Sequence, residues 1–465
     1  MIKLKLSEVA EFVGGRLIGE DSVVFGSVET DSRLVASGSL FVAKPGEVTD
    51  GHNFLDSAKN LGAIGAIVEK AHPEVDMPQI LVDDSVKALG LLAKSVLANV
   101  RASGDLKVIG ITGSNGKTST KNMLCAVLSE FGNTVAPIES FNNEVGLPIS
   151  VLKIDEKTKY LVAELGAGGV GSISYLADIT KPDIGIVLKV GLAHAGAFGG
   201  IEVTAKIKSE LVSALEPKSV FIFNCDDAAV VAMQGLTDAK KVSFGTNREA
   251  DVYFDNVELG LGGTSADIHF ADGQIARLKL QILGEHQMMN AAAAIAVAEE
   301  LGLPRSQVIK ALSELPLAER WRMQLTNRSD GISIINDAYN ASPESMKAAL
   351  QTLAHLGTAG RRTIAVLGEM AELGEFSRDA HDQVGRLVVR YNIDRLVVVG
   401  SGAKLIHMGA MFEGSWDGES IYFDSSSEAL DYIRGMLVSG DIVLVKSSKS
   451  ANLRHLGDDL LEVHS

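Results

Sequence analysis

The chain has 465 residues, which is too long for one hydrophobic core and predicts two to four domains. Hydrophobic residues make up 46% of it and charged residues 22%, the ordinary balance of a globular protein. A formal net charge of −16 argues against a nucleic-acid-binding protein, which needs a basic face. Small anionic ligands stay open, because they need only local positive charge.

The chain carries two cysteines, Cys125 and Cys225, which cannot form a disulfide framework. Both lie in apolar segments, so we expect buried free thiols in a reducing compartment. The opening segment MIKLKLSEVAEFVGG lacks the apolar core of a signal peptide, and no run approaches the ~18 apolar residues of a membrane span. These features predict a soluble cytoplasmic protein with no membrane partner.

Residues 1–104 are predicted to form a small α/β domain. Within them, residues 38–69 contain a strand, a glycine-rich loop, a helix and a second strand. The segment ANVRASGD, residues 98–105, is polar and weakly patterned, which is typical of a linker. We therefore place the first domain boundary there.

Residues 105–315 alternate between strand-like and helical patterns, which predicts a mainly parallel sheet covered by helices. Helices are expected over residues 117–132 and 287–302. The predicted strands are residues 106–112, 160–165, 184–190 and 219–224.

A second alternating series follows, and we assign residues 316–465 to a third α/β domain. Its patterned helix covers residues 378–391. Its predicted strands are residues 332–337, 362–368, 395–400 and 441–446.

The segment GITGSNGKTST, residues 110–120, is a candidate phosphate-binding loop. It fails the general pattern of Gly, four residues and Gly-Lys-Ser/Thr, because Ile111 stands where the first glycine belongs. Its context is nevertheless right, since a hydrophobic strand enters the loop and a helix leaves it. That geometry directs backbone N–H groups and the positive helix end at phosphate oxygens. Lys117 adds a positive charge, and Thr118 offers a hydroxyl to Mg²⁺.

The spacing TGSNGKTST resembles the ATP loop of the Mur ligase superfamily, amide-forming enzymes of peptidoglycan precursor synthesis with folylpolyglutamate synthases as cousins. Other segments resemble motifs of that family in the same order over nearly the whole chain. The motifs DAYNASPESM and GEMAELG are similar to those of members that add D-alanyl-D-alanine rather than a single amino acid. The remaining matching segments are TDSRLVASGSLFVAKPGEVTDGHNF, FNNEVGLP, AELGAG, VGLAHAGAFGG, AKIKSE, GEHQMMNAAAA and VLVKSSKSANL.

This resemblance implies three domains: a small α/β N-terminal domain that binds a uridine nucleotide, a central P-loop ATPase-like domain with a parallel sheet, and a Rossmann-like C-terminal domain. The implied activity is ATP-dependent ligation of D-alanyl-D-alanine to UDP-N-acetylmuramoyl-tripeptide through an acyl phosphate. The implied cofactors are ATP and Mg²⁺ at two sites. We expect a monomer, and the third residue of the tripeptide is left open between lysine and diaminopimelate.

The resemblance also implies the residues that hold ATP and metal. Thr118 and Glu164 would hold the magnesium of ATP, and Glu164 with His194 would hold a second ion. Lys117 and His194 are expected to be catalytic. The phosphate-loop residues implied to contact ATP are Thr112, Gly113, Ser114, Asn115, Gly116, Lys117, Thr118 and Ser119.

Lys206 is identified with the family lysine that becomes carbamylated, a catalytic residue that gives the second metal an anionic oxygen. On the residues alone, Lys206 and Glu210 are spaced like a surface salt bridge on a helix. Lys208 is the neighbouring alternative for the carbamylated position.

Three further residues are expected to reach ATP from outside the phosphate loop. Asn290 resembles the residue that contacts adenine, and Asp337 the residue that meets the ribose. Arg320 resembles the catalytic arginine that moves onto the γ-phosphate when the third domain closes, with Arg322 as a competing choice. Because these residues lie in different domains from Lys117, closure about hinges near residues 100–106 and 314–320 is expected.

Two segments are expected to bind the nucleotide substrate. Asp31, Ser32 and Arg33 resemble contacts to uridine or its diphosphate. Asn142 and Asn143 resemble contacts to the muramoyl-peptide, although they could equally cap the following helix.

The chain departs from the family pattern in the central domain. Gly168 and Gly169 stand where Asn-His is common, and Leu188 and Lys189 replace Thr-Asn. Lys189 could add a cation near the phosphates or indicate altered substrate handling. The competing functions are a Mur ligase that adds one amino acid, folylpolyglutamate synthesis, and an ATP-binding regulatory module without ligase activity.

Overall fold

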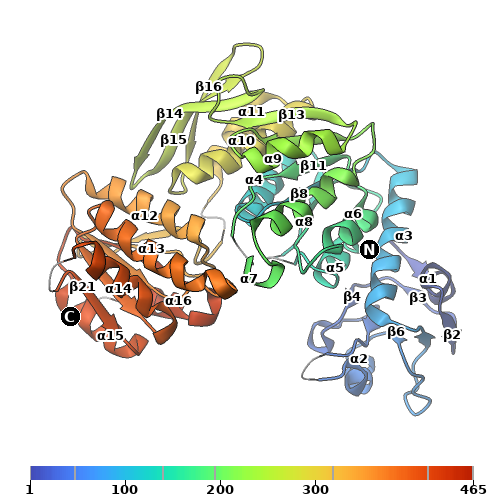
Figure 1. The fold of residues 1–465 in the computed structure, drawn as a ribbon. Coiled ribbons are helices and arrows are strands. Elements are labelled where there is room, and N and C mark those ends of the chain that lie inside the picture. Colours follow the sequence, from blue (N-terminus) through green and yellow to red (C-terminus); the bar gives the residue numbers. More distant parts are fainter. Residues whose placement is uncertain are drawn as a thin grey trace.

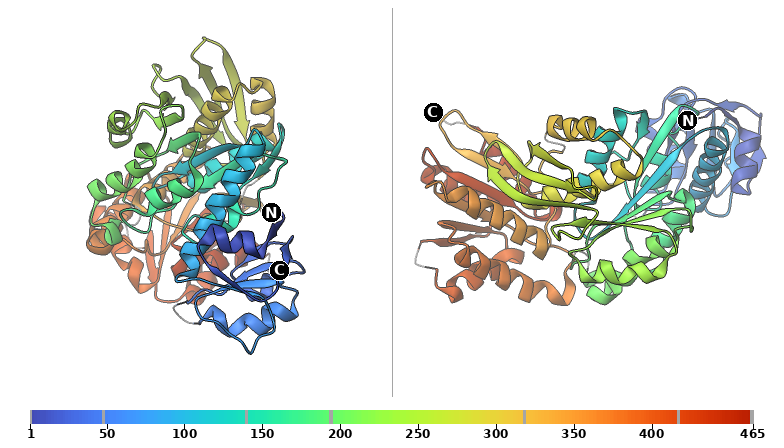
Figure 2. Two further views of the ribbon diagram at one scale, coloured as in Figure 1. Left: turned by 90° about the vertical axis from the view of Figure 1, so that its right-hand side faces the viewer. Right: turned by 90° about the horizontal axis from the view of Figure 1, so that it is seen from above.

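The computed structural model describes residues 2–46, 49–138, 141–192, 195–316, 319–415 and 418–462. Three α/β bodies follow one another along the chain, with the central one between the other two (Figures 1 and 2). Within the described residues, their main sheets have five, nine and six strands. The predicted three-domain α/β fold is confirmed.

The N-terminal body is built on a sheet with the order β2-β7-β6-β5-β4, in which β2 is antiparallel to β7 and the other neighbours are parallel. A small antiparallel pair, β1 with β3, lies beside it. Its elements are β1 (Leu4–Lys5), α1 (Leu6–Val13), β2 (Arg16–Ile18), β3 (Val23–Val24), β4 (Val28–Glu29), η1 (Ser32–Leu34), β5 (Leu40–Val42), η2 (Gly51–Phe54), α2 (Leu55–Asn60), β6 (Gly65–Val68), β7 (Gln79–Leu81) and α3 (Ser85–Ser103).

The segment predicted as a linker, residues 98–105, is mostly helical, because α3 continues to Ser103. The sequence pattern was misleading here, since one face of α3 packs on the central body, where Lys94 pairs with Asp178 at 2.6 Å. Gly90 lies so close to Tyr175 that an added Cβ would be 2.1 Å from the phenolic oxygen. A long helix therefore joins the first two bodies (Figure 1).

The central sheet has the order β16-β15-β14-β13-β12-β11-β8-β10-β9, parallel from β9 to β14. The hairpins β14–β15–β16 extend it with antiparallel strands that the sequence patterns did not predict. The predicted parallel strands are confirmed. The elements are β8 (Lys107–Thr112), α4 (Lys117–Ser129), β9 (Asn133–Val135), α5 (Gly146–Val151), β10 (Thr158–Glu164), α6 (Ser172–Thr180), β11 (Ile184–Val187), α7 (Ala195–Phe198), α8 (Ile201–Ser213), β12 (Val220–Asn224), α9 (Ala228–Val231), η3 (Ala232–Leu236), β13 (Lys240–Gly245), β14 (Val252–Gly260), β15 (Gly263–Phe270), β16 (Ile275–Leu280), α10 (Glu285–Glu300) and α11 (Arg305–Glu314).

The C-terminal body has the strand order β17-β18-β22-β19-β20-β21, with only the edge strand β17 antiparallel to its neighbour among the described strands. Its four predicted strands and its patterned helix are confirmed. The elements are β17 (Gln324–Asn327), β18 (Ser333–Asn336), α12 (Pro343–Gly357), β19 (Thr363–Leu367), η4 (Gly374–Phe376), α13 (Ser377–Arg390), β20 (Arg395–Val399), η5 (Ser401–Ala403), α14 (Lys404–Glu413), β21 (Ser420–Phe423), α15 (Ser426–Met436), β22 (Ile442–Lys446), η6 (Lys449–Ala451) and α16 (Leu453–Asp459).

The central sheet is buried on both faces, which explains why its strands are apolar without alternation. Ile109 and Ile111 of β8 pack under α4 and α10, and Val108 belongs to the core on the opposite face. Because β8, β10 and β11 are parallel neighbours, their carboxyl ends meet at one edge of the sheet. Ligands bind at this edge in open parallel sheets.

The two cysteines are half-buried free thiols, so the expected full burial is wrong. Burial raises the pKa of Cys225 to about 11, with the carboxylate of Asp226 acting in the same direction. Among the described residues, no helix is long and apolar enough to cross a bilayer.

Candidate active site

The phosphate loop lies between β8 and α4 and turns on two glycines. Gly113 has φ of 151° and Gly116 φ of 87°, conformations that residues with a side chain rarely adopt. A Cβ added to Gly116 would also be 2.4 Å from Oδ1 of Asn290. Glycine is therefore required here for both the turn and the packing.

Lys117 is the first residue of α4, and its ammonium folds back over the loop to donate to the carbonyl oxygen of Gly113 at 2.6 Å. Burial lowers the pKa of Lys117, the charge of Glu164 opposes this shift, and Arg322 adds to it. An anionic phosphate at the mouth of the loop would offset this cost of burying the ammonium.

Glu164 lies at the carboxyl end of β10 and is 1% exposed. Its Oε1 accepts hydrogen bonds from Asn142 at 2.8 Å and from the Thr118 hydroxyl at 3.4 Å. Its Oε2 has no hydrogen-bond partner among the described residues. An ionised carboxylate oxygen is costly to bury without a partner, so this atom fits a cation that the protein alone does not supply.

The structure brings Lys208, and not Lys206, to this cluster. Lys206 is exposed on α8, whereas Lys208 is 2% exposed and lines the cavity. The two differ because a step of two residues turns a helix by about 200°. Burial, with the nearby charge of Lys117, lowers the pKa of Lys208 to about 7 against the opposing effect of Glu210. The position chosen from the sequence is therefore not the one at the cavity.

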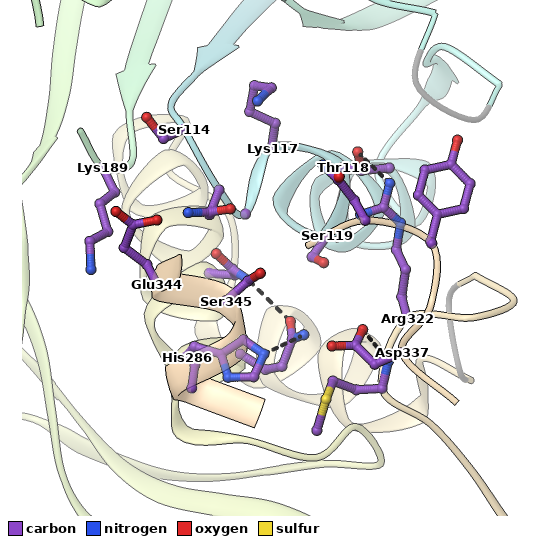
Figure 3. A pocket seen from close by; sticks show the side chains of 18 of the residues that line it. Ser114, Lys117, Thr118, Ser119, Lys189, His286, Arg322, Asp337, Glu344 and Ser345 are labelled. Atoms are coloured by element: carbon purple, nitrogen blue, oxygen red, sulfur yellow. Dashed lines mark hydrogen bonds between the residues drawn. The ribbon is translucent and has the colours of Figure 1, made fainter. Parts of the chain in front are cut away.

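The phosphate loop opens into a cavity of about 420 Å³ between the central and C-terminal bodies. Figure 3 shows Lys117 and Thr118 on its central-domain side, with Arg322 reaching toward Thr118 from the other. The lining residues are Ser114, Asn115, Gly116, Lys117, Thr118, Ser119, Asn142, Glu164, Gly166, Ala167, Lys189, Lys208, His286, Gln287, Asn290, Arg322, Met323, Asp337, Tyr339, Asn340, Glu344, Ser345, Ala348 and Lys446.

Arg322 is the arginine at the cavity. Its guanidinium donates to the Thr118 hydroxyl at 3.3 Å, pairs with Glu319 at 2.7 Å and lies over the ring of Tyr339. Arg320 instead pairs with Asp458 at 2.8 Å, with 64% of its side chain exposed, and does not line the cavity. The structure thus places the competing choice, rather than Arg320, at the phosphate loop.

Asp337 follows β18 and lies on the C-terminal wall of the cavity. Its carboxylate accepts a hydrogen bond from the backbone of Met323 at 3.0 Å and pairs with Lys446 at 2.5 Å. Burial lowers the pKa of the neighbouring His286 to about 4, opposed by Asp337 and reinforced by Lys446. His286 is therefore a neutral group near pH 7, able to accept or donate one hydrogen bond.

Some of the other phosphate-loop residues line the cavity, and others hold the loop and its strand in place. Asn115 and Ser119 line the cavity, and Ser114 also donates to the carbonyl of Gly191 at 3.1 Å. Thr112 is fully buried and donates to the carbonyl of Leu165 at 3.0 Å, so it fixes the strand below the loop. Asn290 lines the cavity beside Gly116, as described above.

Direct contacts hold the C-terminal body against the central body. The Ser342 hydroxyl donates to Oδ1 of Asn115 at 3.2 Å, and the backbone N–H of Leu192 donates to Glu344 at 2.8 Å. Gly196 donates from its backbone to the carbonyl of Glu372 at 3.2 Å. These contacts join the two bodies, and residues of both face one cavity.

The N-terminal triplet lies apart from this cavity. Asp31 accepts from the backbone of Arg33 at the start of η1 and pairs with its guanidinium at 2.6 Å. The side chain of Arg33 is 87% exposed, and Ser32 is buried. The triplet thus offers one exposed cation on the N-terminal body.

Of the two asparagines, one lines the cavity and the other supports the start of a helix. Asn142 lines the cavity and bonds to Glu164, whereas Asn143 accepts from the backbone N–H of Gly146 at 2.8 Å and starts α5. His194 lies outside the described residues.

The departures from the family pattern also have a structural place. The backbone N–H groups of Gly168 and Gly169 donate to the Ser172 hydroxyl, which starts α6. Lys189 lines the cavity, and its carbonyl accepts from the backbone of Ser114 at 2.8 Å. Lys189 is thus a cation at the cavity, one of the two interpretations of its sequence position.

Sequence reasoning missed His286, Glu344 and Lys446 as cavity residues. Lys446 ends a predicted strand within the motif VLVKSSKSANL, and Glu344 lies within DAYNASPESM, so both had a signal as motif members. Their contacts depend on a neighbouring strand or body, which no local pattern reveals.

Models of the Mur ligase family match most of the chain. The Mur ligase family catalytic-domain model matches residues 25–96, the Mur ligase middle domain residues 111–298, and the Mur ligase glutamate ligase domain residues 321–449. With the full-length relatives below, they show that the chain belongs to the Mur ligase family, as its motifs predicted.

The relatives narrow this class to one enzyme type. UDP-N-acetylmuramoyl-tripeptide--D-alanyl-D-alanine ligase of Mycobacterium tuberculosis (strain H37Rv) is 43% identical over 99% of this chain and 98% of its own length. The enzyme of that name from Escherichia coli (strain K12) is 32% identical over 98% of each chain.

Solved MurF structures are also similar to this chain over nearly its whole length. MurF from Acinetobacter baumannii is 29% identical and superposes with a TM-score of 0.90 over 100% of both chains. MurF ligase from Thermotoga maritima in complex with ADP is 27% identical, with a TM-score of 0.82 over 94% of this chain and 96% of that one.

Proposed function

We propose that this chain is an ATP-dependent amide ligase that joins D-alanyl-D-alanine to UDP-N-acetylmuramoyl-tripeptide and so completes the pentapeptide precursor of peptidoglycan. The observation that carries the proposal is the cavity in which the phosphate loop faces Arg322 and Asp337 of another domain. The full-length similarity to relatives of that name supports the choice of substrates.

The reaction is balanced in two steps. A carboxylate oxygen of the tripeptide attacks the γ-phosphorus of ATP, which gives an acyl phosphate and releases ADP. The dipeptide's amine nitrogen then attacks the acyl carbon, the C–O bond to phosphate breaks, and the amine gives up a proton as the amide forms.

The chain's own residues supply the positive charge that phosphoryl transfer requires. Lys117 and the backbone N–H groups at the start of α4 face the phosphates from the central body. Arg322 reaches the same loop from the C-terminal body, close to the Thr118 hydroxyl. Asp337, Asn290 and the neutral His286 form the polar wall for the ribose and adenine.

A magnesium ion fits the oxygen atoms at the end of β10. Thr118 and Glu164 would hold it together with ATP phosphates, which suits an ion that uses one or two protein oxygens and keeps several waters. In the described part of the chain, no cluster of three acidic, histidine or cysteine residues forms a protein-only metal cage. The ion would neutralise charge on the transferring phosphoryl group. His194 remains the family's candidate for a second ion.

Lys208 is the residue we propose to be carbamylated, in place of Lys206. Formation of a carbamate requires a neutral amine, and a pKa of about 7 supplies one near neutral pH. The product would be an anionic oxygen group in the cavity that Glu164 and Lys117 also line, where a second magnesium ion needs a ligand.

The N-terminal body is proposed to hold the uridine diphosphate end of the substrate. Arg33 presents an exposed guanidinium on η1, and its neighbours Asp31 and Ser32 shape that turn. Guanidinium groups bind phosphate oxygens in a bidentate manner, which suits this role.

The decisive experiment is an ADP-release assay with both acceptor substrates. We expect ADP release only when UDP-N-acetylmuramoyl-tripeptide and D-alanyl-D-alanine are present together, with lysine- and diaminopimelate-containing tripeptides compared. Equal activity with D-alanine alone would favour a ligase that adds one amino acid. ATP binding without dual dependence would favour a regulatory module and overturn the proposal.

A further inference from the structure

Arg322 lies in a segment whose backbone is strained on both sides of it. Trp321 has φ of 63° and Met323 φ of 48°, conformations that are unfavourable for residues with large side chains. Such strain is concentrated at functional sites, where the surrounding structure maintains it. The contacts that hold this segment therefore determine where the guanidinium of Arg322 points.

The guanidinium of Arg322 is held by three neighbours. Its Nε donates to Oε2 of Glu319 at 2.7 Å, and a terminal nitrogen donates to the Thr118 hydroxyl at 3.3 Å. Its central carbon lies 4.3 Å from the centre of the Tyr339 ring. These contacts fix the position of the group and leave further N–H donors for an anion in the cavity.

Glu319 is joined in turn to α4, the helix that begins at the phosphate loop. Its Oε1 accepts from Nδ2 of Asn122 at 3.2 Å and lies 3.6 Å from the ammonium of Lys121. Lys121 is 2% exposed and also donates to the carbonyl of Pro137 at 2.9 Å, so this end of the link is buried in the central body. Lys121 and Asn122 follow Thr118 by three and four positions, so the three side chains share one face of α4.

The carboxylate of Glu319 thus uses one oxygen for Arg322 and the other for the central body. Glu319 lies between α11 and β17, where the chain passes from the central to the C-terminal body. It lies outside the described lining of the ATP cavity, so its influence on a ligand there passes through the side chains that it holds. Arg320 differs, because its partner Asp458 belongs to the C-terminal body and gives no link to α4.

We propose that Glu319 is the positioning residue for Arg322, and that its carboxylate aligns the arginine with the phosphate loop by joining it to α4. The inference rests on the proposed function and adds to it a residue that does not itself touch the ligands. A free arginine side chain samples many rotamers. With Glu319 in place, the γ-phosphate of ATP meets a guanidinium that is already aimed at it, which favours the transition state.

The first test separates turnover from binding. Glu319→Gln keeps the size of the side chain and an oxygen for Asn122, but removes the charge that holds Arg322. We expect kcat for ADP release with both acceptor substrates to fall by about tenfold to 100-fold, because small errors in the placement of a charged group are costly. The KM values for ATP and for both acceptors should change by less than about threefold, because the lost interaction belongs to the transition state.

A double variant shows whether Glu319 acts through the arginine. Arg322→Ala should by itself reduce kcat strongly. Glu319→Gln added to Arg322→Ala should cause no further loss, because the group that Glu319 positions is then absent. Losses that multiply in the double variant would show a separate role for Glu319 and would overturn the proposal.

Glu299→Gln is the matched control. Glu299 pairs with Arg305 at 2.6 Å, and 26% and 27% of the two side chains are exposed, close to the 19% and 25% of Glu319 and Arg322. That pair joins α10 to α11 within the central body, so its loss should leave kcat unchanged.

An unchanged kcat in Glu319→Gln would overturn the positioning role. A fall in kcat that only reflects a smaller folded fraction, measured by thermal unfolding, would indicate a structural role and would also overturn it. If the wild-type enzyme released no ADP with both acceptor substrates, the proposed function itself would fail instead.

Discussion

Glu164 is a buried carboxylate whose two oxygen atoms differ in their hydrogen bonding. One of its carboxylate oxygens bonds to Asn142 and Thr118, and the other is buried without a partner among the described residues. A side chain whose only role was structural would have both oxygens satisfied, because an unmet buried acceptor costs about 1–3 kcal/mol.

Glu164→Gln should abolish most turnover without unfolding the protein. The amide keeps the size of the side chain but removes the negative charge that a magnesium ion requires, so we expect kcat to fall by at least about 100-fold. The midpoint of thermal unfolding should stay near that of the wild type. Turnover within a few-fold of wild type would contradict a metal-binding role.

The two lysines of α8, Lys206 and Lys208, can be tested against each other. Lys208→Met should reduce kcat to a few per cent or less, because the buried position beside Lys117 loses its amine. Lys206→Met, on the exposed face of the helix, should leave kcat near the wild-type value. Steady-state ADP release measures both variants, and the reverse ranking would restore the position chosen from the sequence.

His286 gives a pH dependence with a defined sign. Its folded-state pKa of about 4 lies below the usual value of 6.5, so the unfolded chain binds more protons between these values. This residue's contribution to stability is therefore complete above pH 6.5 and is lost as the pH falls toward 4. Urea unfolding from pH 7 to 4 should show a shallower pH slope for His286→Gln than for wild type. Equal slopes would contradict the assignment.

At the scale of elements, the junction of β8, the phosphate loop and α4 determines how ATP can bind. Gly116 starts α4 with φ of 87° and leaves no space for a Cβ beside Asn290. Gly171 has nearly the same conformation at the start of α6, with φ of 90°, and a Cβ there would meet no atom within 4 Å.

Alanine substitutions at these two glycines distinguish the cost of backbone strain from an effect on ATP binding. Gly171→Ala should lower the free energy of unfolding by about 1 kcal/mol, because it forces alanine into a left-handed conformation. Gly116→Ala should lower it by more, because its Cβ would also approach Asn290. Only Gly116→Ala should also weaken ATP binding, by about tenfold or more, as measured by calorimetry. Equal ATP affinity in both variants would show that the loop tolerates a side chain.

At the scale of the whole molecule, the C-terminal body completes a site that neither body holds alone. In this structure Arg322 lies at Thr118 and Ser342 lies at Asn115. Gly374 also lies against Gly196, where a Cβ on Gly374 would be 2.7 Å from the Cα of Gly196. The interface therefore depends on two facing glycines.

Gly374→Val should hinder closure and reduce kcat by about tenfold or more. Gly360→Val is the matched control, because Gly360 also has a positive φ, 79°, but no atom lies within 4 Å of its Cβ position. Small-angle scattering with ATP and both acceptors should show compaction in wild type and Gly360→Val, and less in Gly374→Val. A profile that ligands do not change in any of the three would contradict a closing motion.

Much of the fold could be predicted, because strands such as β8 and β22 are apolar runs bounded by polar residues. The antiparallel hairpins of β14 to β16 could not, since their pairing depends on neighbours rather than on a local signal. In the site, the roles of Glu164 and Thr118 could be predicted because their motifs occur in the same order as in the family. Arg320 and Lys206 were chosen over Arg322 and Lys208, because residues two apart are equivalent in a motif but not in space.

The sequence by itself determined the three α/β domains, the phosphate loop within residues 110–120 and the family, because these depend on local patterns and on the order of motifs. Only the tertiary structure decided which lysine and which arginine reach the ATP cavity, and that Glu319 joins this arginine to α4. The physical reason is that side-chain direction follows from helix phase and from the contact between two bodies. Residues as distant in the chain as Thr118 and Arg322 are neighbours only because the two bodies pack against each other.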